Sequence, residues 1–196
     1  MRRSIILIVL LIFNFFIFYG IKEFNKVIVD KDMMVYFKEK PVVIESEKIE
    51  YLDEIVEEYN GEKIEKIAEK MNKYFAKTSL EEYGEYITKT SAYKKVDPYL
   101  VAGIILESTT CKYDCSILFK ECNNVYMEKG DPGCFGGSYK KYDKIDDSIL
   151  DLVLNIRKNF DDPKDQTPVN IYKHFNKNKT WAFRVDKYIE NLKRVK

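Results

Sequence analysis

The fold is decided by residues 96–108, which read VDPYLVAGIILES. Asp97 can accept hydrogen bonds from the free amides of a first helical turn, and Pro98 suits the first helical position. Residues 99–106 are almost all apolar, which predicts a helix that is apolar on every face. Such a helix belongs at the centre of a fold, and this one is predicted to run as far as Glu107.

Glu107 is the first charged residue after this apolar run. A carboxyl group in that position is expected to be partly desolvated, and desolvation disfavours its charged form. A carboxylic acid that stays protonated near neutral pH can donate a proton to a glycosidic oxygen. Glu107 is therefore a candidate general acid, beside the alternative that it is only the first exposed residue of a C-terminal turn.

More helices are predicted on both sides of the central one, because apolar residues recur there at steps of three and four. The predicted segments are 49–56, 64–75 and about 80–94 before it, and about 149–160, 168–175 and 180–192 after it. Their expected boundaries are the break at Asn60-Gly61, a capping box formed by Ser79 and Glu82, and helix starts at Thr167-Pro168 and Thr180. The fold class is therefore mostly α.

Residues 108–142 contain all four cysteines and several glycines, which predicts a loop-rich lobe with room for a short hairpin. The cysteines are Cys111, Cys115, Cys122 and Cys134. An even, clustered set in an exported domain predicts up to two disulfides, with three pairings open. Zinc is the rival interpretation, but structural zinc sites usually show two close CxxC pairs, which this spacing lacks. No metal site is expected.

The N-terminal block predicts a membrane anchor. Residues 4–21 carry no charged side chain, and Met1-Arg2-Arg3 precedes them. An apolar run of this length comes close to the thickness of the hydrocarbon core, and positive charge before it keeps that end in the cytoplasm. No small-residue cleavage site follows. We expect an anchor over 1–21, a spacer with a first helix over 22–61, and an extracellular domain over 62–196.

Composition and single residues exclude several functions. The chain of 196 residues has 33 Lys and Arg against 32 Asp and Glu, so it lacks the basic excess of a nucleic-acid binder. A zinc amidase would need several His ligands, and the only histidine is His174. A Cys–His enzyme would need a free thiolate, which disulfides would remove. No glycine-rich phosphate loop is present, and no cofactor is expected.

Three motifs resemble known enzymes. Residues 96–108 resemble the segment (V/I)DPxLLLAxxxxES of lysozyme-like peptidoglycan-cleaving enzymes. Asn123-Asn124 resembles the NN pair that follows the catalytic helix in that family. Residues 139–148 are similar to (F/Y)(R/K)xYxSxxES of the bacterial beta-N-acetylglucosaminidase branch. The matches occur in the family's order, within about residues 80–195. The resemblance implies a lysozyme-like helical domain with the disulfide-containing lobe across a groove that holds a glycan strand.

The resemblance also implies roles for individual residues. Glu107 matches the family's proton donor, and Tyr142 matches the tyrosine that lines the sugar site and helps to stabilise the charged transition state. Asn124, Tyr126 and Tyr139 would then bind substrate. Asn124 has the alternative role of capping a turn, and Tyr142 has the alternative role of a packing residue beside a helix start.

The family pattern is not complete, and this leaves the second catalytic group open. Thr109-Thr110 stands where the family has Gly-Trp, and Tyr126-Met127-Glu128 stands where it has an aromatic, a glycine and a hydrophobic residue. Two-carboxylate hydrolysis needs a partner for Glu107. The candidates for that partner are Glu121, Glu128 and Asp131, with Glu128 preferred. The substrate's acetamido group, or a lytic transglycosylase reaction with one acid/base, are the alternatives.

The function expected from the sequence is a membrane-anchored enzyme that faces the cell wall and cleaves peptidoglycan glycan strands, of glucosaminidase or muramidase type. The competing interpretation is a catalytically degenerate relative that binds the wall or serves assembly in a secretion or conjugation machine.

Overall fold

The computed structural model describes residues 56–196, so the predicted anchor over 1–21 and most of the predicted spacer lie outside the described residues. The elements are β1 (Glu58–Tyr59), β2 (Glu62–Lys63), α3 (Ile64–Phe75), α4 (Tyr83–Tyr93), α5 (Pro98–Thr109), α6 (Ile117–Cys122), β3 (Gly133–Cys134), β4 (Tyr139–Lys140), α7 (Ile145–Asn159), the 3-10 helix η2 (Pro163–Asp165), α8 (Pro168–Phe175) and α9 (Lys179–Lys193). The mostly α class is confirmed. None of the described helices is long and apolar enough to cross a membrane.

Helix α5 is the centre of the fold, as its sequence predicts. Every residue of α5 is buried except Glu107, and Ile104, Ile105 and Leu106 are at most 1% exposed. Burial of each such side chain contributes about 1.5 to 3 kcal/mol relative to exposure. The predicted start is confirmed, because the Asp97 side chain accepts a hydrogen bond from the Tyr99 amide at 2.8 Å.

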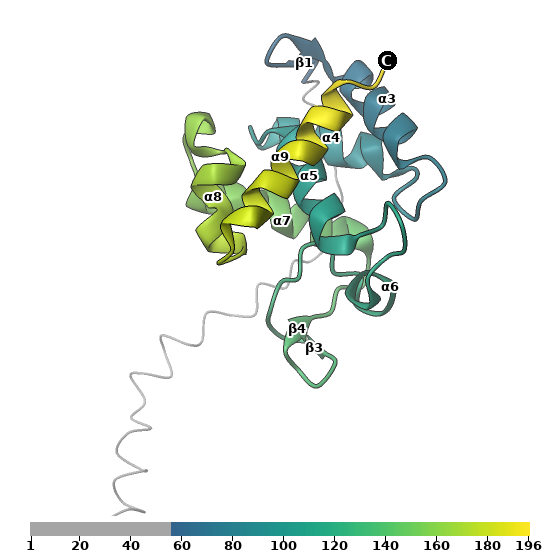
Figure 1. The fold of residues 1–196 in the computed structure, drawn as a ribbon, viewed down its shortest axis with the longest axis vertical. Coiled ribbons are helices and arrows are strands. Elements are labelled where there is room, and N and C mark those ends of the chain that lie inside the picture. Colours follow the sequence, from purple (N-terminus) through teal and green to yellow (C-terminus); the bar gives the residue numbers. More distant parts are fainter. Residues whose placement is uncertain (1–55) are drawn as a thin grey trace, which may run out of the picture. The chain divides into compact units, whose positions relative to one another are not determined.

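Helix α9 lies across α5 (Figure 1). The two helices run antiparallel: Lys193 lies over the Tyr99 ring near the start of α5, and Arg184 pairs with Glu107 near its end. Gly103 makes the close approach possible, because a Cβ atom there would come within 3.0 Å of the Ile189 side chain. This crossing brings the N-terminal half of α9 to the end of α5.

The other helices complete the core around this pair. Helix α4 packs against α3, α5 and α7, and α8 packs against α9. The α3–α4 contact is close at Gly84, whose amide donates to the Asn72 side chain at 3.0 Å. A Cβ atom on Gly84 would lie 2.3 Å from that oxygen, so only glycine fits there without a shift. The largest fully buried side chains are Phe75, Ile67, Met71, Leu80, Ile87, Leu100, Ile104, Ile105, Leu106, Ile149, Leu152 and Ile156.

The start of α4 corrects one prediction. The capping box of Ser79 and Glu82 does not form, because α4 begins at Tyr83 and Glu82 makes no side-chain cap. The chain instead leaves α3 through successive turns, in which the Thr78 hydroxyl accepts from the Leu80 amide at 3.1 Å. Glu82 adopts a left-handed backbone with φ of 82°, which places it outside the helix.

A hairpin precedes α3. The strands β1 and β2 pair antiparallel, with Glu58 opposite Lys63. The break predicted at Asn60-Gly61 is confirmed, and it is the hairpin turn, since both residues have positive φ (50° and 76°), as a two-residue turn of this kind requires. The predicted helical segment 49–56 lies outside the described residues except for Val56, which is not helical.

The lobe over residues 108–142 contains a hairpin, as predicted, and a short helix that was not predicted. The hairpin is β3–β4, which extends away from the helices in Figure 1. Helix α6 is capped by Ser116. The four cysteines form two disulfides, Cys111–Cys115 and Cys122–Cys134. The predicted disulfides are confirmed, and they pair the first cysteine with the second and the third with the fourth. In the C-terminal region, Asn178 and not Thr180 caps α9, because the Asn178 side chain accepts from the Thr180 amide.

Loss of the Cys122–Cys134 bridge is expected to destabilise the protein by about 2 to 5 kcal/mol, since this bridge restricts the unfolded chain over 12 positions. The variant replaces both cysteines by serine, and urea unfolding measures the effect. The paired serine variant of Cys111 and Cys115 is the matched control, because its loop spans only 4 positions and is expected to cost less. An equal or larger loss in the control would contradict the expectation.

Candidate active site

Glu107 reaches the surface at the last turn of α5, where the helix ends. Its side chain is 12% exposed, while the residues on either side, Leu106 and Ser108, are buried. The helix stops because Thr110 adopts a left-handed backbone and its amide bonds to the Leu106 carbonyl at 3.2 Å. The carboxyl group is therefore held by a rigid buried helix and keeps limited access to solvent.

Arg184 on α9 is the direct partner of Glu107. Its Nε and Nη2 atoms both lie 2.6 Å from Oε1 of Glu107, and its Nη1 atom donates to the Thr180 hydroxyl at 3.1 Å. This hydrogen bond to the carboxylate raises the pKa of the Arg184 guanidinium. The sequence predicts a partly desolvated carboxyl group, and the Glu107 side chain is 12% exposed. It does not predict the cation that the crossing of α5 and α9 brings to this group.

The ion pair has a chemical consequence. The guanidinium occupies Oε1 of Glu107, so a ligand can contact that oxygen only if Arg184 moves away. The Arg184 side chain is 49% exposed and sits on a long flexible stem, so an incoming ligand has room to displace it.

Tyr188, Tyr113 and Tyr74 lie near enough to one another to interact through their charges. Tyr188 on α9 is half-buried, and its pKa is raised by burial and then by the negative charge of Glu107, with smaller contributions from Tyr113 and Tyr74. Tyr74 comes from α3, and its hydroxyl accepts from Lys112 Nζ at 2.7 Å. The surroundings of Glu107 are thus aromatic and basic.

A second polar cluster lies between the lobe and α7. We call it the Asp151 cluster: Tyr126, Lys140, Tyr142 and Asp151. Oδ2 of Asp151 accepts from the Tyr126 hydroxyl at 3.0 Å, from the Tyr142 hydroxyl, and from Lys140 Nζ at 3.0 Å. Both tyrosines are 6% exposed, and burial is the main cause that raises the pKa of each. Tyr142, predicted to act on the sugar, therefore has its hydroxyl engaged by Asp151.

Asn124 builds the turn that positions the lobe. Its Oδ1 accepts from the Glu128 amide at 3.0 Å, and its Nδ2 donates to the carbonyl oxygens of Glu128 and Lys140 at 2.8 Å each. The residue is 1% exposed. All its polar contacts are to the backbone, so the turn-capping role that the sequence left open accounts for this side chain. Tyr139, the other predicted substrate residue in β4, is half-buried opposite Cys134.

Glu128 is half-buried beside the Asp151 cluster. It lines a cavity of about 310 Å³ together with Tyr126 and His174. Burial raises its pKa, and the charge of Asp151 raises it further. Within residues 56–196, no hydrogen bond or ion pair connects Glu128 or Tyr142 with Glu107. Glu107 thus pairs with Arg184, whereas Tyr126, Tyr142 and Glu128 lie around Asp151.

Stability is expected to depend on pH through Glu128. Because the pKa of Glu128 is raised in the folded state, this group stabilises the fold fully at pH values below the ordinary pKa of a carboxyl group. That stabilisation is lost as the pH rises through the raised pKa. Glu128→Gln should therefore gain stability relative to the wild type between about pH 4 and about pH 8, as measured by urea unfolding at both values.

The exposed Glu69 is the control with the opposite sign. Its hydrogen bond with Lys73 lowers its pKa, so the wild type gains stability above the ordinary value and loses it as pH falls. Glu69→Gln should thus lose stability relative to the wild type over the same rise in pH. The same trend in both variants would show that the pH dependence does not come from these two carboxyl groups.

The histidine, the cysteines and the acidic residues do not form another catalytic or metal site among the described residues. His174 is exposed, with Nε2 2.6 Å from the Asn155 side-chain oxygen. All four cysteines are in disulfides, so a Cys–His pair has no free thiol. Among the described residues, no three His, Cys, Asp or Glu side chains are grouped to hold a metal ion.

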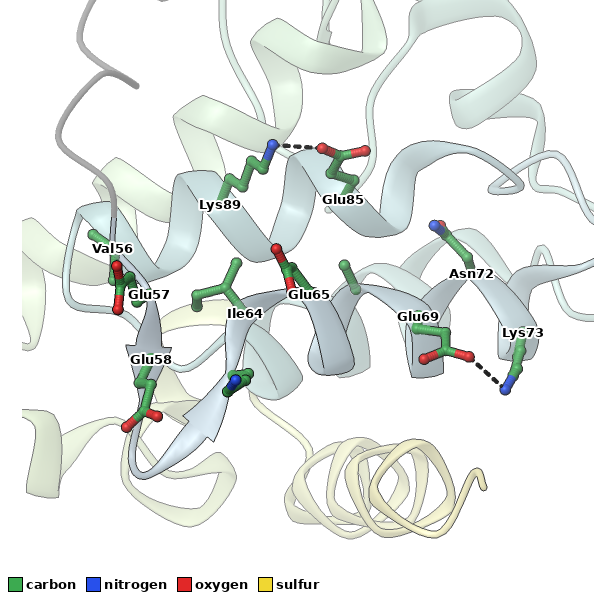
Figure 2. Close-up of a pocket in the computed structure, with 12 residues that line it drawn as sticks. Val56, Glu57, Glu58, Ile64, Glu65, Glu69, Asn72, Lys73, Glu85 and Lys89 are labelled. Carbon is green, nitrogen blue, oxygen red and sulfur yellow. Dashed lines mark hydrogen bonds and ion pairs between the residues drawn. The ribbon is translucent and has the colours of Figure 1, made fainter.

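A groove of about 820 Å³ runs between α3 and α4, where Ile64 and Ala68 lie between charged side chains (Figure 2). The ion pairs Glu69–Lys73 and Glu85–Lys89 border it. None of the predicted site residues lines this groove.

Comparisons with protein families, with curated proteins and with solved structures found no match for this chain.

Proposed function

We propose that this protein is a membrane-anchored enzyme that cleaves the glycan strands of peptidoglycan, with Glu107 as the general acid. The observation that carries the proposal is the position of Glu107. It is the one residue of the central helix α5 that is not buried, and a rigid helix holds its carboxyl group. The resemblance of residues 96–108 to lysozyme-like enzymes supports the same role.

The reaction requires Glu107 to protonate the leaving glycosidic oxygen. In this proposal the glycan strand displaces the Arg184 side chain when it binds, which separates the carboxyl group from its cation and allows the carboxyl group to be protonated. Exclusion of water by the sugar favours the neutral acid further. Arg184 then remains near the substrate as a hydrogen-bond donor.

The second catalytic group distinguishes three schemes. Glu128 would serve as base or nucleophile if substrate binding brought the lobe toward Glu107. If Glu128 stays in its half-buried place beside Asp151, the substrate's acetamido group can act as nucleophile. A lytic transglycosylase reaction needs only one acid/base. All three schemes use the proton of Glu107.

A second candidate is a binding or assembly protein of the cell envelope. The Glu107–Arg184 ion pair favours it, because a carboxylate held by a guanidinium is a stable structural contact as well as a resting acid. The two functions differ in one measurable property, because only the enzyme cleaves the glycan strand.

The test uses the full-length protein in detergent with dye-labelled, purified peptidoglycan. Release of dye, together with mass spectrometry of the products, supports the enzyme and identifies the bond: a reducing end indicates hydrolysis, and an anhydro end indicates a lytic reaction. Binding to peptidoglycan without any release would overturn the proposal in favour of the binding protein. The Glu107→Gln variant shows whether release depends on this residue.

A further inference from the structure

Tyr113 is the most exposed large hydrophobic side chain among the described residues, at 86%. It lies in the segment 110–116, which directly follows α5. An aromatic ring has a large apolar surface, and burial of that surface in a complex is favourable. The ring makes no aromatic pair and its hydroxyl makes no hydrogen bond within residues 56–196, so the fold itself does not explain its position.

The backbone that carries Tyr113 is fixed by several contacts. The disulfide Cys111–Cys115 closes the segment, and the Thr110 hydroxyl donates to the Asp114 carbonyl at 2.8 Å. Asp114 is also paired with Lys120 of α6 at 2.7 Å. A tyrosine on such a backbone has only two side-chain torsions left to restrict, so its ring can bind a ligand at a low entropic cost.

The segment lies at the Glu107 end of α5 and contacts α3. Lys112 donates to the Tyr74 hydroxyl, and its amine lies 4.3 Å from the centre of that ring, which ties the segment to α3. Tyr113 follows Glu107 by six positions, just after the left-handed Thr110 that ends α5. The exposed ring therefore lies on the segment that continues from the end of the helix that carries the proposed acid.

We propose that Tyr113 is a stacking platform for a pyranose ring of the glycan strand, so that the strand crosses Glu107 on the side of α3 and α9. The inference rests on the proposed function and adds the place of a sugar subsite to it. The C–H face of an N-acetylated hexosamine is apolar with partly positive hydrogens, which suits the negative face of an aromatic ring. The Lys112 amine and the Tyr188 hydroxyl can bond to the polar edge of the sugar.

The arrangement differs from the one that the sequence predicts. The sequence assigns substrate contacts to Asn124, Tyr126 and Tyr139. Asn124 and Tyr126 are buried, whereas Tyr113 presents its whole ring to solvent. The sugar subsite nearest to Glu107 thus lies at the disulfide-closed segment 110–116, and not at the Asp151 cluster.

The experiment measures binding of chitotetraose, a soluble oligosaccharide of N-acetylglucosamine. The parent is full-length Glu107→Gln protein in detergent, in which cleavage cannot distort the titration. Isothermal titration gives the Kd for the parent with and without each further substitution. We expect Tyr113→Ala to weaken binding about tenfold, the upper end of what one aromatic contact contributes. Tyr113→Phe keeps the ring and should stay within about threefold of the parent.

Phe183→Ala is the matched control, because Phe183 is an aromatic residue of α9 with 72% exposure that does not belong to the segment. Its Kd should equal that of the parent. Unchanged melting temperatures will show that Tyr113→Ala folds, as expected for so exposed a side chain. An unchanged Kd in Tyr113→Ala, an equal loss in Phe183→Ala, or a parent that does not bind chitotetraose would each overturn the subsite.

Failure of the subsite can be told from failure of the proposed function. If the wild type releases dye from peptidoglycan and Tyr113→Ala binds and releases as well as the wild type, the subsite alone is wrong. If the wild type releases no dye, the enzyme proposal is wrong, whatever the Kd values are.

Discussion

Glu107→Gln is expected to lower kcat on peptidoglycan by about 10² to 10⁴-fold, which is the usual contribution of a general acid. The amide keeps the shape of the side chain and an oxygen that can accept from Arg184, but it has no proton that it can give to a leaving oxygen. The Kd for glycan should change little, since the side chain keeps its size and its place at the end of α5. A loss of kcat with unchanged affinity is the signature of a group that acts in the transition state.

The measurement is dye release with a titration of substrate, in parallel with binding of the intact strand. Glu65→Gln is the control, because Glu65 is an exposed glutamate of α3 and is not among the candidate catalytic groups. It should retain full activity. Substantial turnover in Glu107→Gln would falsify the enzyme as proposed, because all three schemes for the second group depend on that proton.

Glu128→Gln then separates the schemes. A loss comparable to that of Glu107→Gln indicates that Glu128 is the second carboxylate. A much smaller loss indicates that the substrate's acetamido group or a lytic reaction completes the mechanism. Its position beside Asp151 in the free protein, without a contact to Glu107 in the described residues, favours the smaller loss.

The sequence predicts α5 and the position of Glu107 well, because the signals are local. A capping Asp-Pro and an apolar run on every face leave no other placement for residues 97–106. The capping box predicted at Ser79 and Glu82 does not form, also for a physical reason. The backbone amides after α3 are hydrogen-bonded within successive turns, and Glu82 adopts a left-handed backbone.

The surroundings of Glu107 could not be predicted in the same way. Arg184 is separated from it by 77 positions, and the two meet where α9 crosses α5, a crossing that is close at Gly103. An arginine on an amphipathic helix normally faces solvent, so its spacing carries no sign of the ion pair. Asp151 does carry a weak signal, since it stands between Leu150 and Leu152 in a helix that packs in the core. The lobe residues that bind Asp151 carry no such signal in the sequence.

The second large effect is expected at Asp151. Asp151→Ala removes the acceptor shared by the Tyr126 hydroxyl, the Tyr142 hydroxyl and Lys140. A buried donor that loses its partner costs about 1 to 3 kcal/mol, and three donors lose theirs here. The Asp151 side chain is 25% exposed, so water can replace part of the lost contacts. We therefore expect a loss of about 2 to 4 kcal/mol in the free energy of unfolding.

Urea unfolding followed by circular dichroism measures this loss, with Asp186→Ala as the control. Asp186 is an exposed aspartate of α9, and its replacement should stay within about 0.5 kcal/mol. Asp151→Asn keeps one acceptor oxygen and should lose less than the alanine variant. Hydrogen exchange should become faster at the Lys140 amide, since the Lys140 side chain loses its partner Asp151, and should change little in α5. A stability within about 0.5 kcal/mol of the wild type would contradict the expectation and mean that water satisfies all three donors.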